Sequence, residues 1–317
     1  DVVKRMVKEN DIVLEQFRPG VMKRLGVDYE TLVKENPNII YCSLTGYGQT
    51  GPLRDRAGHD NNYLALAGAM SHSGRKKGGP VPQGVQVADL GAGSYGVVMG
   101  ILGAVIHRHA TGEGQYVDVS MFDGALHWNG YAGGQYFVGG ESPAYEEMVL
   151  NGGSQYDYYE TSDGRYMSVG SLEPQFWKAL CEAVGHPEWV EAKTLPGPEI
   201  VAIKVELRKI FLSKTQADWV HVFEPLDACV EPVLTLEEAA NHPHTKARGL
   251  IVDVPKPNGG TQQQIAFPVK FSKSEPRYDH IGSELGAHTE DVLREAGYSD
   301  AEIAVMAEAE LFGPKQD

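Results

Sequence analysis

The stretch that decides the fold is residues 39–52, which read IIYCSLTGYGQTGP. An apolar run followed at once by a Gly-rich loop is typical of a buried strand that ends at a turn. A shorter β-branched run at residues 11–15 precedes it, and a further strand is predicted at 115–120, after a helix at 94–109. Because strands that alternate with helices form βαβ units, the sequence predicts an α/β fold with a mostly parallel sheet.

The pattern of elements changes after residue 138, which divides the chain into domains. Residues 1–138 are predicted to form a large Rossmann-like domain, and residues 139–157 lack clear periodicity and are predicted to be a linker. Short strands and helices from 158 to 268 indicate a smaller α+β domain. Residues 269–317 are expected to form a return linker and C-terminal helices that pack on the large domain. In the last helix, Ser299 and Glu302 have the spacing of a capping box.

Charge and cysteine content narrow the class of protein. The chain has 28 Lys and Arg against 43 Asp and Glu, which argues against general affinity for nucleic acid or an anionic membrane. Its three cysteines are few, odd in number and far apart, so a reducing, cytoplasmic location is expected. None lies at metal-ligand spacing. The longest apolar run, residues 97–106, is broken by two glycines and is too short to span a bilayer.

Basic residues gather in the first quarter of the chain, which would suit a phosphate-bearing ligand. The alternative is that they are ordinary solvated side chains. They are Arg18, Lys23, Arg24, Arg54, Arg56, Arg75, Lys76 and Lys77.

Two polar, Gly-rich stretches carry candidate acid–base groups. Residues 57–63, AGHDNNY, contain His59, and residues 87–93, VADLGAG, contain Asp89 ahead of a predicted helix. Glu173 lies in a third stretch, at the predicted start of another helix. A His, an Asp and a Glu in one cleft could serve as base, acid and orienting partner. The structural alternatives are helix caps for the two carboxylates and a structural role for the histidine.

Residues 91–96, GAGSYG, match the pattern G-x-G-x-x-G between a predicted strand and a helix. With Asp118 on the next strand, this would suit a nicotinamide-dependent dehydrogenase. However, Asp118 lies in mid-strand, and Asp89 would place a negative charge beside the pyrophosphate. We therefore interpret the glycines as small residues that allow close helix packing.

The chain resembles the class III CoA-transferase superfamily (CaiB/BaiF type), and within it the α-methylacyl-CoA racemase branch. The resemblance covers nearly the whole chain and is carried by residues 16–21, 43–52, 58–60, 88–89, 111–115 and 173–176. It implies that an N-terminal strand–helix unit of the family is missing ahead of residue 1. It also implies an interlocked homodimer, with the active site between the large domain of one subunit and the small domain of the other.

The resemblance further implies roles for single residues. Asp89 falls on the essential Asp of the superfamily, His59 on the second base of the racemase branch, and Glu173 orients His59, from the partner subunit. No metal and no cofactor beyond CoA is expected. The CoA and substrate contacts carried over by position are Gln16, Phe17, Arg18, Arg24, Ala57, Gly58, Asp60, Asn61, Asn62 and Tyr63.

The implied reaction is epimerisation of the α-carbon of 2-methylacyl-CoA thioesters. His59 would act on the S face and Asp89 on the R face, while the backbone N–H at or next to Asp89 stabilises the enolate. One alternative is CoA transfer between carboxylic acids with Asp89 as nucleophile, in relatives that usually lack the histidine. A second is a non-catalytic acyl-CoA-binding subunit. The chain departs from the racemase branch in one place. Racemases tend to carry an Asn shortly before the Asp, whereas this chain has GVQV at residues 84–87, which is closer to the wider superfamily.

Overall fold

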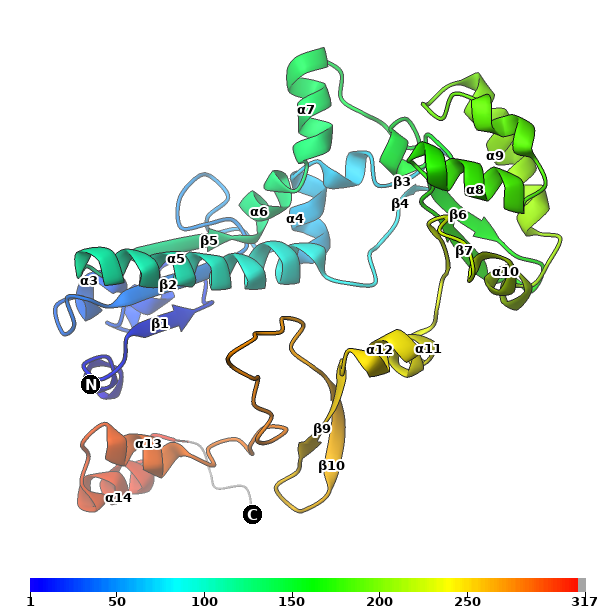
Figure 1. The fold of residues 1–317 in the computed structure, drawn as a ribbon. Helices are drawn as coiled ribbons and strands as arrows, with labels where there is room; N and C mark the ends of the chain where they lie inside the picture. The colour runs from blue at the N-terminus through cyan, green and yellow to red at the C-terminus, as the bar shows by residue number, and fades with distance from the viewer. Residues whose placement is uncertain (313–317) are drawn as a thin grey trace. The chain divides into compact units, whose positions relative to one another are not determined.

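The computed structural model describes residues 1–312, and the chain forms two compact units. The first comprises Asp1 and Val3–Pro232, and the second comprises Val2 and the residues from Val233 on. Figure 1 shows both units with their helices and strands. The second unit begins inside the range 158–268 that the sequence analysis assigns to one small domain.

The first unit contains the predicted parallel sheet. Its strands are β1 (Ile12–Glu15), β2 (Ile40–Thr45) and β5 (Tyr116–Ser120), in the order β1-β2-β5. The central strand β2 is buried along almost its whole length, which explains why most of its residues are apolar. The helices α1 (Val2–Met6), α2 (Val21–Arg24) and α3 (Tyr29–Leu32) lie before and after β1 in the chain. The expected α/β class with a parallel sheet is thus confirmed.

The helix that carries Asp89 differs from the prediction. The sequence analysis expects a strand or loop before residue 94, but a π-helical segment, Val87–Ser94, leads directly into α5 (Tyr95–Thr111). The GAGSYG run therefore lies within a helix, so the strand–turn–helix context of a dinucleotide fingerprint is absent from these residues. A Cβ atom added at Gly96 would lie 3.1 Å from Cγ1 of Val119, which shows that the helix packs closely on β5.

Among residues 1–312, one helical segment, Val87–Thr111, is long and apolar enough, by length and composition, to cross a membrane. The apolar run at residues 97–106 is by itself too short to span a bilayer. The π-helical extension, which the sequence did not predict, gives the segment its additional length. Val97 and Ala104 of this segment are buried. Within α5, the exposed large apolar side chains, which we call the α5 stripe, are Tyr95, Val98, Met99, Leu102 and Ile106.

Two glycines of α5 provide a matched test of its packing. A Cβ atom at Gly100 would lie 2.8 Å from Cγ1 of Val117, a β-branched side chain with little freedom to move, whereas nothing lies within 4 Å at Gly103. We expect Gly103→Ala to raise the free energy of unfolding by roughly 0.5–1 kcal/mol through better helix propensity. Gly100→Ala should lower it by about 1–3 kcal/mol through overpacking. Urea unfolding measures both, and equal stabilisation would contradict the packing of α5 on β5.

The first unit also contains the helices α4 (Asp60–Leu66), α6 (Met121–His127) and α7 (Gly130–Gly139). Helices α6 and α7 are separate, because the side-chain amide of Asn129 donates to backbone carbonyls at the end of α6. Residues 74–80 form a short antiparallel hairpin of β3 (Gly74–Arg75) and β4 (Gly79–Pro80).

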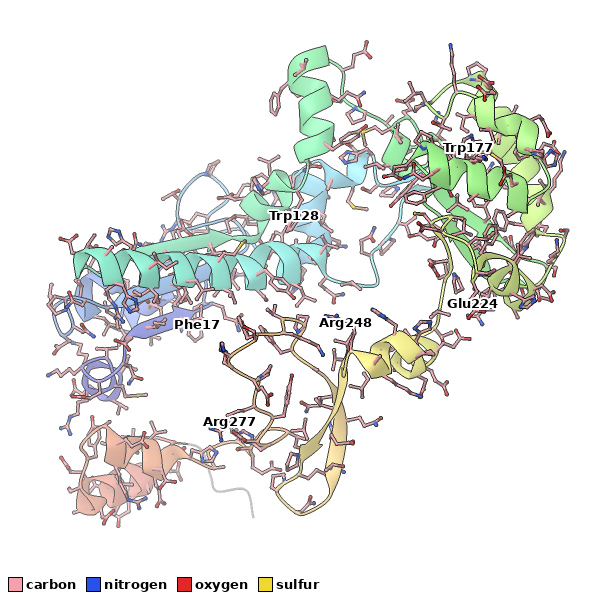
Figure 2. All side chains as sticks on the ribbon, in the orientation of Figure 1. Phe17, Trp128, Trp177, Glu224, Arg248 and Arg277 are labelled. Carbon is pink, nitrogen blue, oxygen red and sulfur yellow. The ribbon has the colours of Figure 1, made fainter. Side chains whose placement is uncertain are left out.

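The remainder of the first unit is a three-stranded antiparallel sheet with helices. The strands are β6 (Asp157–Glu160), β7 (Tyr166–Val169) and β8 (Val230–Pro232). The helices α8 (Pro174–Ala183), α9 (Pro198–Phe211) and α10 (Gln216–Phe223) share one buried core with this sheet. On α8, the indole N–H of Trp177 (Figure 2) donates to the backbone oxygen of Trp189 at 2.9 Å.

The second unit contains α11 (Leu236–Asn241) and α12 (Pro243–Ala247), followed by an antiparallel hairpin and two helices. The hairpin strands are β9 (Ile251–Pro255) and β10 (Thr261–Ile265), and the helices are α13 (Thr289–Glu295) and α14 (Asp300–Glu308). The predicted capping box of Ser299 and Glu302 is confirmed at the start of α14. That these helices pack on the large domain stays a prediction.

Candidate active site

Three cavities adjoin one another around the parallel sheet, and one of them lies at the carboxyl end of β2, where α/β sheets bind ligands. We call them the arginine cavity (about 320 Å³), the central cavity (about 410 Å³) and the carboxylate cavity (about 550 Å³). Arg18, Pro19 and Arg54 line both the arginine and the central cavities. His59 lines both the central and the carboxylate cavities. The three cavities therefore form one series, from an end where Arg18, Lys23 and Arg54 stand among the carboxylates of Glu15, Asp28 and Glu30 to an acid–base end.

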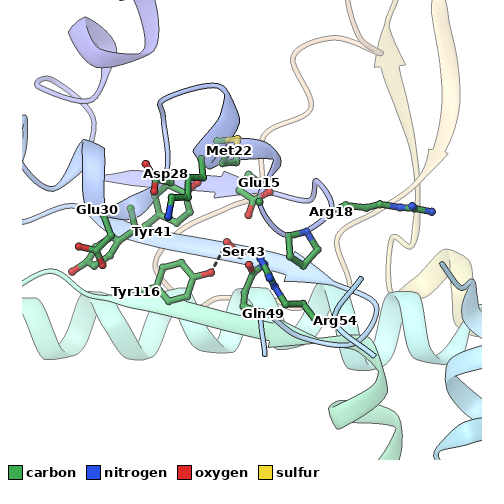
Figure 3. A pocket seen from close by; sticks show the side chains of 14 residues that line it. Glu15, Arg18, Met22, Asp28, Glu30, Tyr41, Ser43, Gln49, Arg54 and Tyr116 are labelled. Atoms are coloured by element: carbon green, nitrogen blue, oxygen red, sulfur yellow. Dashed lines mark hydrogen bonds between the residues drawn. The ribbon is translucent and has the colours of Figure 1, made fainter. Parts of the chain in front are cut away.

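The arginine cavity (Figure 3) presents donor groups that have no acceptor within residues 1–312. Nε2 of Gln49 and Nε of Arg54 are buried without a hydrogen-bond partner among the described residues. Arg18 and Lys23 also line this cavity, and neither forms an ion pair within residues 1–312. Guanidinium and ammonium groups without carboxylate partners suit a bound anion such as a phosphate.

Arg24 lies beside this cavity without lining it. A Cβ atom at Gly20 would lie 3.7 Å from Nη1 of Arg24 and 3.7 Å from Nη2 of Arg54, so the two guanidinium groups approach the same backbone position. Gly20 has a φ of 83°, in the left-handed region that favours glycine. Of this pair, the sequence analysis assigns only Arg24 to the site. Apart from its charge, nothing in the sequence distinguishes Arg54 from the other basic residues in the first quarter of the chain.

The tyrosines on the opposite wall of the arginine cavity act as neutral donors. The hydroxyl of Tyr116 donates to Oγ of Ser43 at 2.9 Å, and the rings of Tyr41 and Tyr116 stack with centroids 5.7 Å apart. Burial raises the pKa of both tyrosines, and the neighbouring Glu15 raises it further. Both phenols therefore stay protonated over the physiological pH range.

The central cavity collects most of the residues predicted to contact CoA. They come from the loop after β1, from the loop that leads into α4 and from α4 itself: Gln16, Phe17, Arg18, Ala57, Gly58, Asn62 and Tyr63. Phe17 (Figure 2) is 53% exposed, and its backbone N–H donates to Oε2 of Glu15 at 2.8 Å. This wall thus offers an exposed aromatic ring close to the arginines.

Tyr63 holds the loop in place from inside the protein. Its side chain is buried, its hydroxyl donates to the backbone oxygen of Gly58 at 2.5 Å, and its ring meets Tyr47 edge-on with centroids 5.1 Å apart. A Cβ atom at Gly46 would lie 2.5 Å from the Tyr63 hydroxyl, so only glycine fits there. Tyr63 therefore shapes the central cavity mainly by fixing the backbone ahead of His59.

His59 stands where the central and carboxylate cavities meet. It precedes the first residue of α4, and its backbone N–H donates to Oδ1 of Asn62 at 3.1 Å. His59 as a whole is exposed in the single chain. Asp60 and Asn61, predicted as substrate contacts, line the carboxylate cavity together with His59.

Asp89 lies across the carboxylate cavity on the π-helical segment. Its partial burial raises the pKa of its carboxyl group; the carboxylate of Asp60 raises that pKa further, whereas His59 lowers it. The backbone N–H groups of Ala88 and Asp89 both donate to Oδ1 of Asp60, at 2.7 and 3.1 Å. The N–H of Asp89, expected to stabilise an enolate, is thus already engaged, because the carboxylate of Asp60 is its acceptor.

The sequence analysis does not identify the apolar wall of the carboxylate cavity. Leu64 and Met70 border the acid–base groups, as do residues 80–82 after the β3–β4 hairpin. The alternation of proline and valine at 80–82 could have signalled an extended apolar segment, since proline cannot continue a helix and valine favours extended backbone. A cavity with apolar lining and two convergent acid–base groups has the character of a small-molecule site.

Glu173 is not brought to His59 within one chain. It precedes the first residue of α8, it is exposed, and none of the three cavities includes it. It lies near Cys229 instead. Burial above all raises the pKa of that thiol, and the carboxylates of Asp227 and Glu173 add to the effect. A role for Glu173 at the partner subunit's site stays a prediction.

Known proteins resemble this chain in sequence and in fold. The model of CoA-transferase family III matches residues 1–289. An alpha-methylacyl-CoA racemase of Mus musculus is 37% identical, over 95% of this chain and 79% of the relative. A succinate–glutarate CoA-transferase of Agrobacterium fabrum is 32% identical, over 93% of this chain and 74% of the relative. A solved CAIB/BAIF family protein from Brucella suis has a TM-score of 0.76 and 28% identity, covering 93% of this chain and 78% of that one.

Proposed function

Because the chain belongs to CoA-transferase family III, we propose that it epimerises the α-carbon of 2-methylacyl-CoA thioesters. The observation that carries this proposal is that His59 and Asp89 line one cavity, which adjoins a cavity lined by Arg18 and by Arg54, whose Nε has no hydrogen-bond partner among the described residues. The likeness to a racemase at 37% identity supports it. We propose no cofactor beyond the CoA moiety of the substrate and a cytoplasmic location.

The proposed placement of the substrate follows the series of cavities. The phosphates of CoA lie against Arg18, Arg24 and Arg54, since guanidinium groups bind phosphate oxygens in pairs. The pantetheine arm crosses the central cavity, and the thioester reaches the boundary marked by His59. The acyl chain then rests on the apolar wall that Leu64 and Met70 border.

The proposed chemistry uses the two acid–base groups on opposite faces of the α-carbon. With the R epimer, the carboxylate of Asp89 takes the α-proton, and the electron pair of the C–H bond passes into the thioester as an enolate. Protonated His59 then gives a proton to the other face, and the S epimer follows the reverse path. General acid–base catalysis of this kind contributes about 10²–10⁴-fold per group. A raised pKa makes Asp89 a stronger base than an ordinary Asp.

The second candidate is CoA transfer between carboxylic acids. The carboxylate of Asp89 would attack the thioester carbonyl, release CoA as a thiolate and form a mixed anhydride. The likeness to a succinate–glutarate CoA-transferase favours this reaction, as does the open position of Asp89 in its cavity. His59 beside Asp89 favours the epimerase, because transfer through an anhydride needs no second base.

Nuclear magnetic resonance of the α-proton in D₂O decides between these candidates. We expect (R)- and (S)-2-methylacyl-CoA each to incorporate deuterium and lose optical purity when no acid acceptor is present. If the α-proton persists and CoA moves once a free carboxylic acid is added, the protein is a transferase. Tight binding of the thioester with neither reaction would show a non-catalytic acyl-CoA-binding subunit.

We also propose that the protein works as a homodimer. The α5 stripe exposes five apolar side chains on one helix in the single chain, an arrangement that a second subunit would bury. The partner subunit's small domain would then bring its own Glu173 toward His59. This arrangement would explain why Glu173 lines none of the three cavities of its own chain.

A further inference from the structure

We propose that Asp60 is a positioning residue for Asp89, holding the first turn of the π-helical segment with its carboxylate and placing a negative charge beside the base. This inference rests on the proposed function, in which Asp89 is the base for one epimer. It gives Asp60 a role different from the direct substrate contact that the resemblance implies.

The geometry of the helix start carries the first part of the proposal. The first N–H groups of any helix lack partners within the helix. Here Gln86, which precedes the π-helical segment, gives no side-chain cap. The N–H groups of Ala88 and Asp89 instead donate to one oxygen of Asp60, at 2.7 and 3.1 Å. Asp60 therefore caps, from another helix, the very turn that carries Asp89.

The same contact ties the two acid–base groups together. Asp60 is the first residue of α4 and follows His59 directly, so its backbone moves with that of the histidine. The next turn of α4 is anchored because Tyr63 and Leu64 are buried. A shift of the π-helical segment relative to α4 would break two hydrogen bonds to a carboxylate, each stronger than a neutral one. The spacing of the two bases is therefore set through Asp60.

The charge of Asp60 has a second consequence. The groups that face Asp89 are His59 and Asp60 from the start of α4, together with Tyr63 from the same helix. Burial and the like charge of Asp60 raise the pKa of Asp89, and His59 opposes them. Removing the charge of Asp60 should therefore lower the pKa of Asp89. The acid limb of Asp89-dependent proton abstraction then moves to lower pH.

Two variants separate position from charge. Asp60→Asn keeps an acceptor oxygen and removes the charge, while Asp60→Ala removes both. The control is Asp218→Asn, which changes a carboxylate in the first turn of α10, outside the three cavities. We expect the ¹³C-carboxyl titration of Asp89, assigned with Asp89→Asn, to show a lower pKa in Asp60→Asn and no change in the control. With the R epimer, Asp60→Ala should lower kcat about 10–100-fold with KM nearly unchanged, as a misplaced base would.

The outcomes that overturn the proposal are distinct from a failure of the proposed function. An unmoved Asp89 titration in Asp60→Asn, or a raised KM with normal kcat in Asp60→Ala, would make Asp60 a plain substrate contact. If Asp60→Ala does not fold, Asp60→Asn still tests the charge through the same titration. If the wild-type protein exchanges no α-proton, the epimerase proposal fails, while the carboxyl titration of Asp89 still decides the role of Asp60.

Discussion

Asp89→Asn is expected to abolish inversion of 2-methylacyl-CoA while the protein stays folded and binds the thioester. Asparagine has the size of aspartate but cannot take up a proton, so the rate of inversion should fall by about 10²–10⁴-fold. His59→Gln should cause a similar loss, because inversion needs a base on each face of the α-carbon. Asp123→Asn, an exposed first-turn carboxylate of α6 outside the cavities, is the control and should keep full activity.

The two site variants should differ in their residual exchange. In Asp89→Asn, His59 still removes the α-proton of the S epimer, so deuterium enters that epimer without inversion. In His59→Gln, the R epimer exchanges instead. Separate NMR time courses for each epimer in D₂O measure this, together with calorimetric binding of the thioester. Undiminished inversion in Asp89→Asn would exclude Asp89 as a base, and loss of exchange from both epimers in each single variant would contradict the assignment of one base to each face.

Asp157→Ala is expected to lower the free energy of unfolding by about 3–5 kcal/mol, the cost of breaking a buried ion pair. Asp157 is 7% exposed at the start of β6. One of its oxygens accepts from Nη2 of Arg75 at 2.7 Å, and the other lies 2.9 Å from Nζ of Lys204. Lys204 is itself buried and also donates to the backbone oxygen of Gly152. Without Asp157, the ammonium group would be left in the core with no carboxylate partner.

Matched variants separate the buried pair from its exposed neighbour. Arg208 is half exposed, and its Nη2 lies 3.5 Å from Asp157, so Arg208→Gln should cost less than about 1 kcal/mol. Replacing Lys204 by Met in the Asp157→Ala background should recover part of the loss, because no unpaired charge then remains. Urea unfolding gives each value. A loss below about 1 kcal/mol in Asp157→Ala would contradict the ion pairs.

The same cluster predicts a dependence of stability on pH. Burial by itself would raise the pKa of Asp157, but hydrogen bonds from Arg75 and Lys204 hold it below its ordinary value. The stability that the cluster contributes is therefore present above the unfolded pKa of about 3.9 and is lost as the pH falls through the lower folded pKa. Arg75 belongs to the β3–β4 hairpin, and the residues after this hairpin line the carboxylate cavity. Loss of the cluster should therefore also loosen the apolar wall of the site.

Local patterns in the sequence determined much of the fold. The mostly apolar run of β2 indicated a buried strand, and the Gly-rich loop after it marked the end of that strand. Ser299 and Glu302 predicted the start of α14 at the correct residue. The loop 57–63 was singled out by its composition, and its residues line the cavities or support them. These features depend on neighbours within a few residues, which is why they can be predicted from the chain alone.

Only the tertiary structure decided how the functional groups meet. The helix around Asp89 begins at Val87 because Asp60, far away in sequence, accepts its first N–H groups. Arg54 joined Arg24 at Gly20 through the path of a loop, with no pattern to announce it. Hydrogen bonds and charges act over a few ångströms in space, whatever the separation along the chain. Sequence periodicity reports which face of an element is buried, but the partner on that face is chosen by the packing of the whole domain.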